Sequence, residues 1–155
     1  GIGQAWGADT WTLVKDVSEL AAGDEVVIAA SGSNYALGTT QNNNNRAAVS
    51  ITKSGNNITW TTSVQILTLK TGKTSGTFAF YTGSGYLYAA SSSKNYLKTQ
   101  TTNNENGSWS IAIDAKGVAT VKVKLSKKKT YKVSIKFAGD NSYKPASKKV
   151  KITIR

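Results

Sequence analysis

Three residue types that carry much of protein chemistry are missing from this 155-residue chain, which has no His, no Cys and no Met. His and Cys are the commonest general bases and nucleophiles near neutral pH, so their absence argues against most enzyme mechanisms. Without them a metal site would need oxygen ligands, which suit Ca²⁺. The sequence therefore predicts a protein that is not an enzyme and that uses no cofactor.

Carboxylates are also scarce, with eight Asp and Glu against 20 Lys and Arg. Asp24 and Glu25 are adjacent in a predicted strand, so their side chains would face opposite ways. Two carboxylates across a glycosidic bond are enough for a glycosidase, but no spacing here selects such a pair. The turn Asp140-Asn141-Ser142 is too short for a calcium loop. We predict neither catalytic residues nor a metal site.

Long apolar runs are lacking as well. None approaches the roughly 18 residues of a membrane-spanning helix, so no membrane span is predicted. The first residues instead resemble the end of a signal peptide, because the small residues Ala5 and Gly7 precede Ala8 as they do at a cleavage site. This pattern predicts export by a cleaved signal peptide and an extracellular or cell-surface location.

Basic residues gather in the last quarter of the chain. Residues 114–155 hold 13 of the 20 Lys and Arg and two of the eight Asp and Glu, whereas residues 1–113 are close to neutral. Such asymmetry predicts two modules with different surfaces. We therefore divide the chain into an N-terminal segment (1–9), which is a signal-peptide tail or an exchangeable strand, a β-rich module (10–113) and a Lys-rich β segment (114–155).

The fold class follows from composition and spacing. Thr, Ser, Asn, Val and Tyr are abundant, Pro occurs once, and apolar residues lack helical spacing. Short β-branched and aromatic runs alternate with turn residues, which is typical of antiparallel hairpins. The sequence predicts an all-β barrel or sandwich. In residues 10–113, strands are expected at 25–30, 35–39, 47–52, 58–62, 64–70, 76–82, 86–90, 96–100 and 108–113.

Part of the module repeats along the chain. Residues 34–45 and 95–106 both begin with Asn-Tyr, continue through Thr and Gln, and end in an Asn-rich run. Repetition at this scale predicts two copies of one supersecondary unit, since solenoid repeats are usually about 20 to 50 residues long. We expect the Asn runs at loop tips, because Asn tolerates left-handed backbone.

The Lys-rich segment has a different pattern. Apolar and basic residues alternate in 121–125, 131–137 and 149–155, so each predicted strand has one apolar and one basic face. The basic face would be a solvated surface that discourages edge pairing, or a site for an anionic polymer such as teichoic acid or an acidic glycan. Nucleic acid is disfavoured, because no aromatic residue shares this face. The residues of the basic face are Lys122, Lys124, Lys132, Lys136, Lys149 and Lys151.

Aromatic residues of the module have two interpretations. They fill a β core, which strands favour, or they stack on sugar rings in a binding groove. Trp60, Tyr81 and Trp109 belong to this wide group. Tyr86 and Tyr88 would share one strand face, with amide side chains available as hydrogen-bonding neighbours. The narrower set of candidate ligand-binding residues is Tyr35, Tyr86, Tyr88, Asn95, Tyr96 and Gln100.

Three segments carry a family resemblance over residues 10–113. They are residues 18–24 (Ser-Glu-Leu-Ala-Ala-Gly-Asp), 85–90 (Gly-Tyr-Leu-Tyr-Ala-Ala) and 107–111 (Gly-Ser-Trp-Ser-Ile). This part of the chain resembles a module of secreted Bacteroidetes proteins, and the last two segments are similar to core positions of a β-trefoil lobe. The resemblance implies a trefoil-like barrel and implies no activity.

Residues 114–155 resemble a second family. Residues 114–121 (Asp-Ala-Lys-Gly-Val-Ala-Thr-Val) and 137–146 (Phe-Ala-Gly-Asp-Asn-Ser-Tyr-Lys-Pro-Ala) are similar to the closing strands of bacterial and archaeal immunoglobulin-like adhesin repeats. This implies a partial immunoglobulin-like β-sandwich. Both resemblances are incomplete, so unpaired edges would need a cover. The module itself, a neighbouring subunit or a composite origin with a junction near Asp114 would explain them.

Two functions are consistent with these patterns. The first is a non-enzymatic extracellular adhesin-like or structural protein, a filament subunit that self-assembles by strand exchange. The alternative is a secreted carbohydrate-binding module. Expected partners are further copies of the chain and a glycan or anionic surface polymer. The residues predicted to mediate self-association are Ile2, Gln4 and Trp6.

Overall fold

The chain is described by a computed structural model that covers residues 10–126, 129–132 and 143–145, with side chains through Val123. These residues form antiparallel strands and two single-turn 3-10 helices, with no α-helix in the described ranges. The predicted all-β class is therefore confirmed. The strands are β1 (Thr10–Leu13), β2 (Glu25–Val26), β3 (Tyr35–Asn42), β4 (Asn45–Ser50), β5 (Lys53–Ser54), β6 (Asn57–Thr59), β7 (Leu67–Thr71), β8 (Phe78–Tyr81), β9 (Tyr86–Ala89), β10 (Leu97–Gln100), β11 (Trp109–Ile113), β12 (Ala119–Ser126), β13 (Lys129–Lys132) and β14 (Tyr143–Pro145), and the helices are η1 (Val17–Glu19) and η2 (Glu105–Gly107).

The largest sheet has the strand order β10-β9-β8-β11-β12-β13, and β7 joins it at β8 and carries β2 on its other edge. Its inner face holds the main core. Phe80 and Trp109 are fully buried there, with ring centroids 6.1 Å apart. The indole Nε1 of Trp109 donates a hydrogen bond to the Leu87 carbonyl at 3.2 Å, so the buried polar atom is satisfied.

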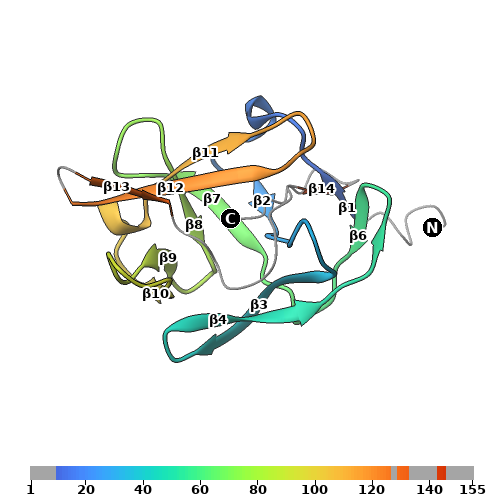
Figure 1. The fold of residues 1–155 in the computed structure, drawn as a ribbon, viewed down its shortest axis with the longest axis horizontal. Helices are drawn as coiled ribbons and strands as arrows, with labels where there is room; N and C mark the ends of the chain where they lie inside the picture. Colours follow the sequence, from blue (N-terminus) through green and yellow to red (C-terminus); the bar gives the residue numbers. More distant parts are fainter. Residues whose placement is uncertain (1–9, 127–128, 133–142, 146–155) are drawn as a thin grey trace.

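Two smaller sheets complete the fold. One has the order β14-β1-β6-β5, and the other is the β3–β4 ribbon. Trp11 and Ile58, which pair across β1 and β6, are buried in a second core with Val64. Figure 1 shows the β3–β4 ribbon and the β11–β12 hairpin on opposite sides of the view, with β2, β7 and β8 between them.

Strands of the Lys-rich segment add to sheets of the preceding module. β12 pairs with β11 from Trp109↔Val123 to Ile113↔Ala119, and β14 pairs with β1. Val121 and Val123 are at most 1% exposed and belong to the main core. The sequence left open what covers the unpaired edges of the Lys-rich segment. In the structure, strands of residues 10–113 pair with β12 and β14. The boundary at residue 114 stays a prediction.

The β11–β12 connection is a tight turn. Oδ1 of Asp114 accepts hydrogen bonds of 2.9 Å from the amides of Lys116 and Val118. Gly117 has φ +84°, which favours glycine, and a Cβ at this position would come within 2.8 Å of the Leu13 side chain. The turn chemistry of this segment therefore fixes the hairpin that carries β12 into the core.

The two repeated segments touch each other. Asn43, at the tip of the β3–β4 ribbon, has φ +53°, as expected for Asn in a tight turn. The Leu97 amide donates to the Asn44 carbonyl at 3.0 Å, and Nε2 of Gln41 donates to the Leu97 carbonyl at 3.1 Å. In the second segment, Asn104 caps η2. The repeat thus contributes contacts between the tip of the β3–β4 ribbon and β10.

Candidate functional site

A cavity of about 380 Å³ lies where the main sheet meets the segment 60–66 that precedes β7. This volume is within the range of small-molecule sites. We call it the Trp60 cavity. Its lining includes Glu25, Thr39, Trp60, Thr62, Gln65, Thr68, Tyr81 and Gly83.

Strand register explains why three of these residues meet. Glu25 on β2 is directly opposite Thr68 on β7, and Thr68 is directly opposite Tyr81 on β8. Directly opposed residues share one face of an antiparallel sheet. Their chain neighbours Val26 and Phe80 are fully buried on the other face. The cavity therefore forms on the outer face because the alternating strands bury their apolar residues inside.

Trp60 forms the aromatic wall. Its Nε1 donates to the Val64 carbonyl at 2.9 Å, and the Val64 amide donates to Thr61 in a turn at 3.0 Å. The indole N–H is thus already bonded within its own loop. A ligand in the cavity would therefore meet the aromatic surface of Trp60 and not a free N–H group.

Gln65 forms a fixed polar wall and is 9% exposed. Its Oε1 accepts a 2.7 Å bond from Nη2 of Arg46, and its Nε2 donates to the Ile66 and Thr82 carbonyls at 2.7 and 3.3 Å. Arg46 also donates to the Gly38 carbonyl at 3.0 Å. Burial lowers the pKa of Arg46 below its ordinary value, yet a guanidinium stays charged at neutral pH. Arg46 therefore positions Gln65.

Tyr81 connects the cavity with the neighbouring strand. Its hydroxyl donates to the Gly83 carbonyl at 2.9 Å. Its ring lies 5.0 Å from the ring of Tyr86, at an interplanar angle of 49°, and Nζ of Lys70 lies 5.5 Å from the Tyr81 ring centroid. Tyr81 is thus shared between the Trp60 cavity and the outer face of β9.

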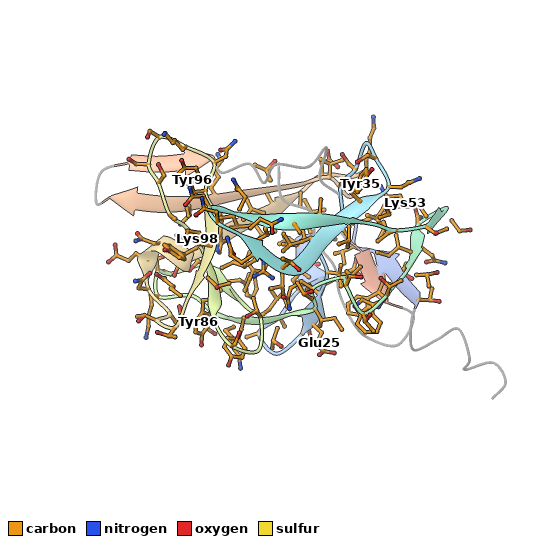
Figure 2. The ribbon with its side chains drawn as sticks, turned by 90° about the horizontal axis from the view of Figure 1, so that it is seen from below. Glu25, Tyr35, Lys53, Tyr86, Tyr96 and Lys98 are labelled. Atoms are coloured by element: carbon orange, nitrogen blue, oxygen red, sulfur yellow. The ribbon has the colours of Figure 1, made fainter. Side chains whose placement is uncertain are left out.

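The structure brings together three of the six predicted ligand-binding residues. Tyr86 and Tyr88 lie on the outer face of β9, and Tyr86 is directly opposite Gln100. The amide Nε2 of Gln100 donates to Oδ1 of Asn104 at 2.7 Å. Figure 2 shows Tyr86 on the same side of the molecule as Glu25. This group adjoins the Trp60 cavity through Tyr81.

The other three predicted residues lie elsewhere. Tyr96 comes just before β10, with Nζ of Lys94 5.8 Å from its ring centroid, and Asn95 precedes it. Tyr35 is 45% exposed at the start of β3. Figure 2 shows Tyr35 near Lys53 and away from Tyr86, so the structure does not place it with the tyrosines of β9.

Most of the predicted basic face and self-association segment lies outside the described residues. Lys122 is exposed on β12, opposite Ser110. Lys124 and Lys132 lie in β12 and β13, where only the backbone is described. The remaining predicted residues lie outside the described ranges, and they are Ile2, Gln4, Trp6, Lys136, Lys149 and Lys151.

Sequence reasoning missed several residues of the Trp60 cavity. Trp60 and Tyr81 were in the wide aromatic group but not in the narrower set, and Thr68 and Gln65 carried no signal. The period-two pattern shows which residues share a face of one strand, but not which strands are neighbours. The register β2-β7-β8 supplies that information and identifies the site.

Among the described residues, no three Asp or Glu side chains gather as a metal site would require. Within these ranges no helix has the length and apolar character to cross a bilayer. The carboxylate that lines the Trp60 cavity is that of Glu25.

Fold and site together define an antiparallel all-β protein with a cavity that combines aromatic and hydroxyl groups. No family model, curated protein or solved structure matches the chain. The resemblances to a secreted Bacteroidetes module and to adhesin repeats therefore stay sequence-based predictions.

Proposed function

We propose that this protein is a non-enzymatic, extracellular or cell-surface adhesin-like protein that binds a glycan in the Trp60 cavity. The observation that carries the proposal is the meeting of Trp60 and Tyr81 with hydroxyl and carboxylate groups around one cavity of about 380 Å³. Concave sites with aromatic walls and a few convergent polar groups are typical of small-molecule binding.

The chemistry of the cavity favours a sugar over an apolar ligand. The indole face of Trp60 suits stacking against the C–H face of a sugar ring, because an aromatic ring has a negative face. Thr39, Thr62 and Thr68 supply hydroxyl groups that both donate and accept, and Glu25 supplies an acceptor for sugar hydroxyls. An apolar ligand would offer the threonine hydroxyls no hydrogen-bonding group.

The same residues favour binding without turnover. Glycoside hydrolysis uses a pair of carboxyl groups, roughly 5 to 9.5 Å apart. In the described part of the chain, Glu25 is the carboxylate that lines the cavity, and Asp24, the residue before it, accepts a hydrogen bond from the Ala21 amide at 2.9 Å instead. A ligand would therefore be held and released unchanged.

The proposal is tested with a glycan array followed by calorimetry on the glycans retained. We expect Trp60→Ala to weaken binding about ten-fold or more, because it removes the stacking surface, where each factor of ten in Kd is about 1.4 kcal/mol. Thr68→Val, which keeps the strand and its shape, should also weaken binding. Tyr35→Ala is the matched control, since Tyr35 is an exposed aromatic outside the cavity.

Circular dichroism of each variant separates loss of binding from loss of fold. Retention of a glycan by the wild type, with Thr68→Val weakened and Tyr35→Ala unchanged, supports the proposal. The proposal would be contradicted if the folded wild type retained no glycan. It would also be contradicted if Trp60→Ala and Thr68→Val bound the glycan as tightly as the wild type. Self-assembly through Ile2, Gln4 and Trp6 is a separate prediction of the sequence.

A further inference from the structure

Three tyrosines continue from the Trp60 cavity across the outer face of the sheet. Tyr81 lines the cavity, its ring contacts Tyr86 at 5.0 Å, and Tyr88 follows Tyr86 on the same face of β9. We call Tyr81, Tyr86 and Tyr88 the tyrosine track. Given the proposed glycan binding, on which this step rests, we infer that the ligand is an acidic oligosaccharide, with one sugar in the Trp60 cavity and the following sugars on the track.

The length of the ligand follows from strand register. A row of directly opposed residues runs across five strands, and it consists of Glu25, Thr68, Tyr81, Tyr86 and Gln100. Neighbouring strands lie about 4.8 Å apart, so the four intervals span about 19 Å. A single sugar ring is much shorter than this row. A chain of several sugars would contact both Trp60 at one end and the tyrosines of β9 at the other.

The charge of the ligand follows from two lysines beside the track. Lys70 lies on the same face of β7 as Thr68, with its Nζ 5.5 Å from the Tyr81 ring centroid. Lys98 on β10 is directly opposite Tyr88. Both lysines are thus beside the tyrosine track.

The two lysines lie on different strands of the row. Lys70 is on β7, next to the β2 strand of Glu25, and Lys98 is on β10 at the other end. A carboxylate or sulfate group of the ligand would be attracted by both lysines. The acidic sugars therefore fit the tyrosine track, which lies between the strands of Lys70 and Lys98.

The test uses an array of oligosaccharides of matched length, some neutral and some bearing uronic acid or sulfate groups, and single uronic acids as a length control. We expect the acidic oligosaccharides to be retained more strongly than the neutral oligosaccharides and the single uronic acids. Their retention should fall as salt is added. Lys70→Gln and Lys98→Gln should each weaken binding about two- to five-fold, as exposed ion pairs do. Lys116→Gln, an exposed lysine in the β11–β12 turn, is the matched control.

The outcomes separate this inference from the proposed function. Equal binding of neutral and acidic oligosaccharides would overturn the acidic ligand and leave glycan binding in place. Unchanged binding by the Lys70→Gln and Lys98→Gln variants would do the same. A single uronic acid bound as tightly as the oligosaccharide would overturn the extended ligand. If the folded protein retains no glycan of either kind, both the inference and the proposed function fail. Retention of acidic oligosaccharides that both lysine variants weaken confirms the inference.

Discussion

Arg46 contributes to the Trp60 cavity without lining it. Its guanidinium lies between the β3–β4 ribbon and Gln65, and it donates to Oε1 of Gln65 and to the Gly38 carbonyl. Among the described residues its Nε has no hydrogen-bond partner, and burial lowers its pKa. The cost of burying this cation is offset by the two bonds, which leave Gln65 Oε1 satisfied in a nearly buried position.

Replacing Arg46 should therefore destabilise the fold. We expect Arg46→Met to lower the free energy of unfolding by about 1–3 kcal/mol, because Gln65 Oε1 and the Gly38 carbonyl lose their donor. Urea denaturation of the variant measures this change. Lys15→Met, at an exposed position, is the control for loss of one positive charge. Equal stabilities of the two variants would contradict the role given to Arg46.

At the scale of elements, the β11–β12 turn and the short helix η1 have the clearest local causes. Gly117 adopts φ +84° in the turn. We expect Gly117→Ala to lower the free energy of unfolding by about 1–2 kcal/mol, the cost of a left-handed residue with a Cβ. The contact with Leu13 adds to this only as far as that flexible side chain cannot move. Thermal unfolding against Gly32→Ala, where a Cβ meets nothing within 4 Å, gives the comparison. Equal unfolding midpoints of the two variants would contradict backbone strain at Gly117.

The helix η1 gives a pH-dependent prediction. Oδ1 of Asp16 accepts a hydrogen bond from the Ser18 amide at 2.9 Å, and this bond lowers the pKa of Asp16 below its ordinary value. A carboxylate with a lowered pKa in the folded state stabilises the fold above its unfolded pKa. That contribution is lost as the pH falls below about 4, through the folded pKa.

Asp16→Asn isolates this effect, because Asn also caps a helix but does not titrate. We expect the stability difference between the wild type and Asp16→Asn to shrink as the pH falls from 6 to 3, in denaturant titrations at each pH. A difference that stays constant over this interval would show that Asp16 does not contribute through its charge.

The alternation of apolar and polar residues predicted most strands of residues 10–113. Tertiary contacts determined the strand boundaries that this pattern did not predict. Strands were expected at 58–62 and 64–70, whereas β6 ends at Thr59 and β7 begins at Leu67. The segment between them turns at Thr61, and Val64 bridges to Gly38 on β3. Its β-branched residues resemble a strand locally, but these contacts form the loop that holds Trp60. The cavity was missed for this reason, while the tyrosines of β9 followed directly from their spacing.

At the scale of the whole molecule, strands from both predicted modules share sheets. β12 brings Val121 and Val123 into the core of β8 and β11, and β14 covers an edge of β1. Edge pairing of this kind removes hydrogen-bonding groups that would otherwise invite association. Residues 1–9, which are predicted to exchange between copies, lie outside the described ranges. A measurement in solution tests this prediction.

Light scattering after size-exclusion chromatography makes that measurement. The sequence-based prediction is that the full chain forms oligomers, and that a variant with Ile2→Lys and Trp6→Lys is shifted toward the monomer, because charge at both positions opposes burial of the strand. A monomeric full chain, or oligomers that the double substitution leaves unchanged, would contradict strand exchange.

A crystal structure of the chain with an acidic oligosaccharide that the array retains tests glycan binding in the Trp60 cavity most directly. We expect a sugar ring against the indole of Trp60, within hydrogen-bonding distance of Glu25 or Thr68, and the next sugars over Tyr81 and Tyr86. A ligand bound instead at Tyr35 or on the lysine face of β12, with the Trp60 cavity empty, would contradict this expectation.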